Sequence, residues 1–206
     1  MCIRDRGGSG LLALNWALIK KEQDEVTIGI HKKNVSLSGI DTRLLTLNSV
    51  KNIEQALDDI KPDIVIHTAG LTSIEECEVN PDLARYTNVE LAKNVAKACS
   101  LNKISLTHIS TDHLFSGAIP MVDEHQQVAP LNTYGHTKSE AEQHVLDIYP
   151  ETLIVRTNFY GWGPLFKPSF SDIIIDSLRS NNGLHLFHDV FYTPILIETL
   201  VNTVHD

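Results

Sequence analysis

Two residues four positions apart, Tyr134 and Lys138, have the types and the spacing that a proton-transfer site needs. They open a predicted helix over 132–148, and a spacing of four places both side chains on one face of it. A free phenol has a pKa of about 10, and a neighbouring ammonium lowers that pKa by favouring the phenolate. Tyr134 would then pass a proton to a carbonyl oxygen as hydride arrives at its carbon, while Lys138 would also bond the ribose of a nicotinamide cofactor. In the alternative interpretation the tyrosine only packs at the helix start and the lysine is a solvated charge.

Small hydroxyl and acidic residues, Ser110, Thr111 and Asp112, follow a predicted buried strand over 104–109. Ligands of open α/β sheets bind outside the carboxyl ends of the strands. The Thr111 hydroxyl, with Ser110, is therefore placed to hold the oxygen that receives the proton from Tyr134. The Tyr-x-x-x-Lys spacing alone is common by chance, and this neighbourhood gives it weight.

Glycines near the start of the chain suggest a phosphate-binding turn. Gly7 and Gly10 stand three residues apart, and Ala13 follows at the same interval within an apolar helix. A backbone without side chains approaches a pyrophosphate closely, and a helix N-terminus stabilises its charge. Gly7, Ser9, Gly10 and Leu11 are therefore candidate cofactor-binding residues. The alternative is a frayed N-terminus in which the glycines are coincidental.

The residues after the second predicted strand bear on the choice of cofactor. An NAD site commonly has a carboxylate about twenty positions beyond the glycines, whereas this chain has His31, Lys32 and Lys33 there. Ammonium groups suit the 2′-phosphate of NADP. The sequence therefore favours NADP over NAD, with a solvated basic turn as the alternative.

Strand and helix patterns alternate along most of the chain. Continuous apolar runs indicate strands buried on both faces, as in a parallel sheet, and the alternation predicts a Rossmann-like, doubly wound α/β fold. The predicted strands cover 26–30, 43–47, 63–67, 104–109 and 153–156, and the predicted helices cover 50–60, 81–100 and 132–148. Beyond residue 157 the predicted elements are a helix over 169–180, a strand over 184–187 and a helix over 194–204. We expect an NAD(P)-binding domain over 1–157 and part of a substrate-binding region over 158–206.

Composition narrows the classes of partner. The net charge of −9 argues against a nucleic-acid partner, and no apolar run approaches the ~18 residues of a membrane span. The start lacks the apolar stretch of a signal peptide, and three cysteines without a close pair favour reduced thiols in a cytoplasmic protein. His185 and His188 would point to opposite faces of their predicted strand, so no metal site is expected.

Taken together, these residues resemble the extended short-chain dehydrogenases/reductases, most closely the dTDP-4-dehydrorhamnose reductase branch. The resembling segments follow the order of that family over nearly the whole chain. They are 7–12, 61–70, 76–78, 87–89, 110–117, 134–138 and 156–161.

The resemblance implies a Rossmann-type NAD(P) domain, a smaller sugar-nucleotide region and Thr111, Tyr134 and Lys138 as the catalytic set. It implies a nucleotide-sugar substrate, and a homodimer is a further expectation. Implied cofactor-side residues are His67, Ala69, Gly70 and Asn88, and implied substrate-side residues are Thr111, Asp112, Arg156, Thr157 and Asn158.

The chain departs from the family pattern at its start, and the pattern leaves alternative functions open. Ile3, Arg4, Asp5 and Arg6 stand where relatives have an apolar first strand, so we expect that strand to be missing or replaced and the chain to be a fragment trimmed at both ends. The first hypothesis is NADPH-dependent reduction of a nucleotide-linked 4-keto-6-deoxy sugar. Asp112 beside the threonine keeps an epimerase or dehydratase open. A non-catalytic NADP-binding subunit, like the beta subunit of methionine adenosyltransferase, is the remaining alternative.

Overall fold

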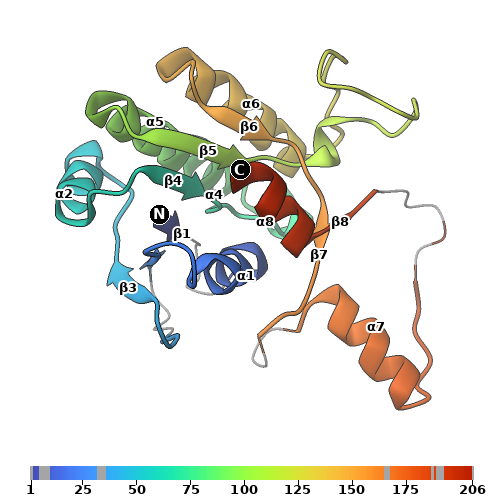
Figure 1. The fold of residues 1–206 in the computed structure, drawn as a ribbon. Coiled ribbons are helices and arrows are strands. Elements are labelled where there is room, and N and C mark those ends of the chain that lie inside the picture. The colour runs from blue at the N-terminus through green and yellow to red at the C-terminus, as the bar shows by residue number, and fades with distance from the viewer. Residues whose placement is uncertain are drawn as a thin grey trace.

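A computed structural model describes residues 2–4, 10–31, 36–164, 168–186, 188 and 193–205, with only the backbone of residues 2–4. Six parallel strands form one sheet in the order β3-β2-β1-β4-β5-β6, which is the strand order of a Rossmann fold. Figure 1 shows helices on both faces of this sheet. The strands are β1 (Cys2–Arg4), β2 (Thr27–Ile30), β3 (Asp41–Leu44), β4 (Ile64–His67), β5 (Ser105–Ile109) and β6 (Leu153–Val155).

The structure contains the helices that the apolar periodicity predicts, and it has further short helices in the connecting segments. They are α1 (Leu11–Lys20), α2 (Val50–Ile60), α3 (Ile74–Val79), α4 (Pro81–Arg85), η1 (Tyr86–Glu90), α5 (Leu91–Asn102), η2 (Asp112–Leu114), α6 (Thr133–Ile148), α7 (Phe170–Arg179) and α8 (Ile197–His205). The segment η1 is a π-helical turn that continues α4 into α5, so the predicted helix over 81–100 is present with one irregular turn.

Adjacent residues of one strand face two separate cores. Val65 packs with α2, α5 and α6, whereas Ile66 packs with α1 and α8. Side chains alternate between the faces of a strand, and both faces of this sheet are covered by helices (Figure 1). This double burial explains why the β4 sequence is continuously apolar.

The prediction that the first strand is missing is corrected by the structure. Residues Cys2–Arg4 form β1, which pairs in parallel with β2 and β4. Ile3 lies opposite Ile28 on one side and Ile66 on the other. An empty central position would leave the facing backbone groups of β2 and β4 without partners, and even a three-residue strand supplies them. Asp5 and Arg6 lie outside the described residues.

Three other predictions differ from the structure. The strand expected over 43–47 lies at Asp41–Leu44, and residues 184–186 of the strand expected over 184–187 form no strand, while residue 187 lies outside the described residues. The helix expected from 194 begins at Ile197, because Ile195–Leu196 first pairs with Phe159–Tyr160 as strands β8 and β7. Two-residue strands carry too little alternation to be recognised in a sequence.

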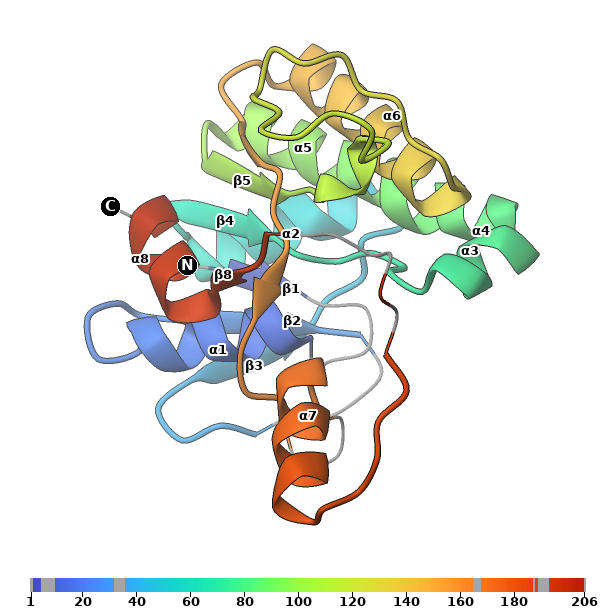
Figure 2. The same cartoon turned by 90° about the vertical axis from the view of Figure 1, so that its right-hand side faces the viewer.

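The segments after residue 157 differ in how they pack. Helix α8 returns to the sheet, where Ile197, Leu200 and Val201 share a core with α1. Helix α7 has no buried residue and extends away from the sheet in Figures 1 and 2. The Asn15 amide of α1 donates to the Trp162 carbonyl at 3.0 Å, so α1 is also joined to the loop before α7.

Among the described residues, no helix is long and apolar enough to cross a membrane. The same part of the chain contains no group of three or more histidine, cysteine, aspartate or glutamate side chains able to hold a metal ion. Cys77 and Cys99 are buried cysteines.

Candidate active site

The candidate residues gather where β4, β5 and β6 end. These carboxyl ends point to the right in Figure 1 and toward the viewer in Figure 2. The Ser110 amide continues the pairing of β5 by donating to the Val155 carbonyl at 2.7 Å. Both Ser110 and Thr111 are buried. This pairing fixes the position of Thr111 directly after the carboxyl end of β5.

Thr111, Asp112 and Asn158 form one hydrogen-bonded group. The Thr111 hydroxyl caps η2 by accepting from the His113 amide at 3.2 Å, and it donates to an Asp112 carboxylate oxygen at 3.4 Å. The other Asp112 oxygen accepts from the Asn158 amide at 3.3 Å. The structure thus unites three of the predicted substrate-side residues. Thr157 lies beside them and its hydroxyl donates to the Asn158 carbonyl at 3.3 Å.

Polar contacts fix the start of α6, which carries Tyr134. The Asn132 side chain accepts from the Gly135 amide at 2.7 Å, and a Glu78 oxygen of α3 accepts from the Thr133 amide at 2.7 Å. A Cβ atom on Gly135 would lie 2.5 Å from the His113 carbonyl oxygen. The glycine therefore lets α6 approach η2 closely enough to bring Tyr134 to the end of β5.

Tyr134 is buried near the carboxyl end of β5. Its ring contacts the ring of His113 in a T-shaped arrangement, with a centroid distance of 5.7 Å. Burial raises the pKa of its phenol, a hydrogen bond with Thr111 lowers it, and the Asp112 charge raises it further. The prediction that this pKa is lowered is therefore wrong. Removal from water is the largest effect on the phenol, and a spacing of four on a helix does not reveal it.

Lys138 is buried one turn further along α6. Its ammonium donates to the Ile109 carbonyl at 2.7 Å and lies 3.2 Å from Nε2 of His108. Burial lowers the pKa of Lys138 to about 8, and the Glu142 charge acts in the opposite direction. The ammonium is thus held at the end of β5.

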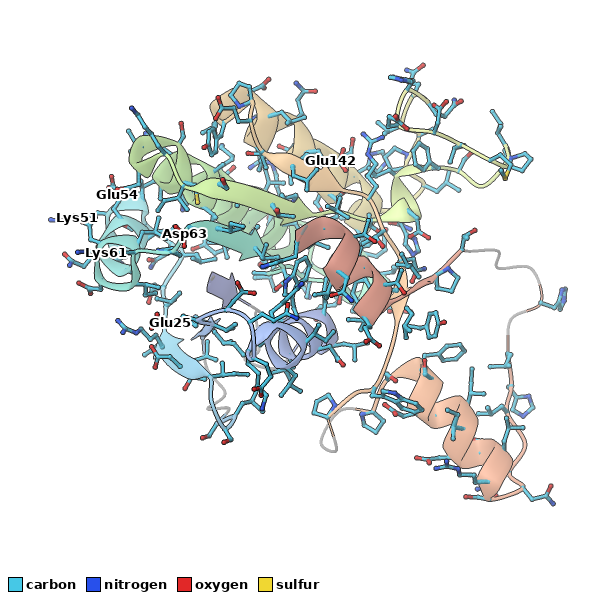
Figure 3. All side chains as sticks on the ribbon, viewed as in Figure 1. Glu25, Lys51, Glu54, Lys61, Asp63 and Glu142 are labelled. Carbon is cyan, nitrogen blue, oxygen red and sulfur yellow. The ribbon has the colours of Figure 1, made fainter. Side chains whose placement is uncertain are left out.

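Arg156 and Glu142 form a partly buried ion pair behind Lys138. The guanidinium donates to both carboxylate oxygens, at 2.8–3.2 Å, and lies 5.7 Å from the centre of the Phe115 ring. Glu142 is labelled on α6 in Figure 3, far from the charged side chains of α2 such as Lys51. Arg156 was predicted to face a substrate, and the structure places two of its donors on Glu142. The sequence signal for Glu142 is its position four residues after Lys138.

Asn88 and Gly70, which the sequence analysis predicts on the cofactor side, lie next to each other in the structure. The Asn88 side chain is buried, accepts from the Leu71 amide at 2.6 Å and donates to the Leu71 carbonyl and the Thr137 hydroxyl, at 3.1 and 2.9 Å. It joins the loop after β4 to α6. A Cβ atom on Gly70 would lie 3.2 Å from the Asn88 oxygen. Asn88 therefore positions the loop after β4. It lies in η1, and π-helical turns of this kind are frequent at functional sites.

The predicted phosphate-binding turn is described only at its end. Gly10 precedes α1 and, having no side chain, does not cap the helix itself. The N-terminus of a helix is a site that a pyrophosphate fits. His67 and Ala69 are buried at the end of β4, and His31 is half-buried after β2. Gly7, Ser9, Lys32 and Lys33 lie outside the described residues.

The sheet order, the glycine-led first helix and the polar groups at the carboxyl ends of the strands define a Rossmann-like α/β protein. The chain belongs to the family described as the RmlD substrate binding domain, whose model matches residues 6–206.

Its relatives include reductases. The chain is 27% identical to the probable low-salt glycan biosynthesis reductase Agl14 of Haloferax volcanii, over 91% of this chain and 64% of that protein. It is 28% identical to dTDP-4-dehydrorhamnose reductase of Salmonella typhimurium, over 75% and 52%. A crystal structure of dTDP-4-dehydrorhamnose reductase from Bacillus anthracis in complex with NADP is 26% identical, with a TM-score of 0.80 over 99% of this chain and 69% of that one. The chain thus spans about half to two thirds of the length of these relatives.

The close approach at Gly135 is testable by Gly135→Ala. The new methyl group must push α6 away from η2, because the opposing atom at 2.5 Å is backbone. Overpacking of this kind lowers the free energy of unfolding by about 1–3 kcal/mol, measurable by urea denaturation. Gly183→Ala is the matched control, since nothing lies within 4 Å of its added Cβ. Equal stability of the two variants would contradict the close packing.

The burial of Lys138 predicts a pH-dependent effect of Lys138→Met. The folded-state pKa of about 8 lies below the ordinary value of 10.5, so the folded protein binds fewer protons than the unfolded chain between these pH values. The penalty for the buried charge is present below pH 8 and is relieved as the pH rises toward 10.5. The free energy of unfolding of the wild type should therefore gain about 3 kcal/mol relative to Lys138→Met from pH 7 to 10.5. Urea denaturation at several pH values measures the difference, and a constant difference would contradict a lowered pKa.

Proposed function

We propose that the chain carries the catalytic centre of an NADPH-dependent reductase that acts on a nucleotide-linked 4-keto-6-deoxy sugar. The observation that carries the proposal is the grouping of Thr111, Tyr134 and Lys138 at the carboxyl ends of the sheet strands. Family membership and the reductase relatives support the same reaction class. The NADP complex of the Bacillus anthracis relative supports the cofactor.

In this reaction the reduced nicotinamide would supply hydride to the keto carbon. The Thr111 hydroxyl would hold the keto oxygen, beside the buried phenol with which it already interacts. The Tyr134 phenol is protonated at neutral pH and can give its proton to the oxygen, and burial, by raising its pKa, makes it a weaker acid in the ligand-free chain. Lys138 would bond the cofactor ribose through the ammonium that is held at the end of β5.

The remaining residues would serve binding. We place the pyrophosphate at the N-terminus of α1, with Gly7, Ser9, Gly10 and Leu11 around it. Asp112 and Asn158, which share a hydrogen bond, are proposed to meet the sugar. Residues 1–157 would hold the cofactor, and residues 158–206 would contribute to the substrate side.

Removing the Tyr134 hydroxyl tests the reaction. NADPH oxidation with dTDP-4-keto-6-deoxy sugars should lose about 10²–10⁴ in kcat in Tyr134→Phe, because no positioned acid remains. The control is Tyr149→Phe, which makes the same chemical change at the far end of α6, at its C-cap. Equal rates for wild type and Tyr134→Phe would remove this tyrosine from the mechanism. Tight NADPH binding without turnover of any keto sugar would favour the regulatory alternative.

The basic residues after β2 predict the cofactor preference. Direct titration should give a Kd for NADPH at least about tenfold lower than that for NADH, because ammonium groups pair with the 2′-phosphate. The double variant Lys32→Ala/Lys33→Ala should weaken NADPH binding and leave NADH binding nearly unchanged. Lys51→Ala/Lys61→Ala removes the same charge from residues on and just after α2 and is the control. A preference of the wild type for NADH would contradict the choice of NADP.

A further inference from the structure

Two histidines and a lysine form a buried cluster under the candidate site. His67 of β4 and His108 of β5 are register partners in the sheet, and their ring centroids lie 5.2 Å apart. Both side chains project to the face covered by α5 and α6, because they alternate with Ile66 and Thr107. Lys138 reaches this cluster from α6. All three residues are at most 5% exposed.

The contact between His108 and Lys138 restricts the protonation of both. A lysine ammonium has three hydrogens to donate and no lone pair, so Nε2 of His108 must be unprotonated where it faces the charged lysine at 3.2 Å. The imidazole is then neutral and carries its hydrogen on Nδ1. That atom is buried without a hydrogen-bond partner among the described residues. Burial and the Lys138 charge lower the pKa of His108 well below its usual value, which agrees with a neutral ring.

Several other charged or titratable groups surround the pair. Glu142 lies one turn along α6 and is paired with Arg156 after β6. Tyr134 precedes Lys138 by one turn, and Asp112 of η2 acts on Tyr134. Glu142 favours the charged lysine through space. The direct hydrogen-bond partners of the ammonium are the Ile109 carbonyl and the His108 ring.

We propose that His108 is a positioning residue for Lys138: its neutral imidazole accepts a hydrogen bond from the ammonium, keeps the lysine charged and holds it at the end of β5. The catalytic consequence of this role rests on the proposed function, whereas the effect on Lys138 itself does not. A hydrogen bond to the charged form favours that form, so losing the acceptor makes the buried ammonium release its proton at lower pH. His108 would then set the alkaline limit of the reaction without touching the substrate.

The first measurement follows Lys138 directly in the ligand-free chain. With ¹³C-labelled lysine, the Lys138 NMR signal is assigned by its loss in Lys138→Met, and its titration midpoint is expected at about pH 8. His108→Leu, which removes the acceptor, should lower that midpoint by about one unit. His108→Gln, whose amide oxygen reaches the position of Nε2, should keep the midpoint near that of the wild type.

Thr107→Val is the matched control for burial on the same strand, because Thr107 is equally buried and faces the opposite side of the sheet. His108→Asn is a second variant in case the leucine protein does not fold, since its shorter amide cannot reach Lys138. A Lys138 midpoint that is the same in the acceptor-free variants and in Thr107→Val would overturn the proposal.

The second measurement is the pH profile of kcat/KM for NADPH with a keto-sugar substrate. The alkaline limb should move by the same interval as the Lys138 midpoint in His108→Leu and return in His108→Gln. A moved midpoint with an unmoved limb would overturn the catalytic role of His108. Absence of turnover by the wild type would instead overturn the proposed function, and the NMR titration would still decide whether His108 positions Lys138.

Discussion

The burial of the Lys138 ammonium against the end of β5 is the constraint that organises this molecule. Taking an ammonium out of water costs on the order of several kcal/mol, and the ammonium must therefore meet acceptors in the protein. The Ile109 carbonyl and His108 meet this requirement only when α6 lies directly over β5. Tyr134, one turn earlier on the same helix, is then necessarily beside Thr111. The arrangement of the candidate catalytic groups thus follows from the solvation of a single charge.

The polar residues around the site divide into two groups with different tasks. Asn88, Asn132 and Glu78 bond to backbone amides and fix the loop after β4 and the start of α6. Thr111 and Tyr134 lie buried at the carboxyl end of β5 and interact with each other. A rigid shell of the first kind lets the second kind keep a fixed geometry before any ligand arrives, which lowers the entropic cost of a reaction.

The sequence predicts the structure best where a physical pattern is local and repeated. The predicted helix over 50–60 matches α2 residue for residue, because its apolar stripe is regular and Ser49 precedes it. The predicted strand over 104–109 contains β5, and the predicted strand over 63–67 contains β4, where burial on both faces leaves a continuous apolar run. The fold class and the grouping of Thr111 with Tyr134 follow from these elements and their order.

What could not be predicted depends on contacts between distant segments. The pKa of Tyr134 responds to burial created by η2 and α3, which no helical spacing encodes. The role of His108 is likewise hidden, because an isolated histidine in an apolar strand gives no sign of the lysine thirty residues later. The charged start of the chain concealed β1, whose place is specified by pairing with β2 and β4 and not by its own composition.

The return of α8 to the sheet has a consequence for how such proteins can be divided. Helix α8 shares a core with Leu12, Trp16 and other α1 residues, although 176 positions separate the end of α1 from the start of α8. A protease cut or a domain exchange placed after Thr157 would put α1 and α8 on different pieces of chain, although the two helices share one hydrophobic core. Chimeras of this family should therefore inherit α1 and α8 from the same parent, because the two helices form one packing unit.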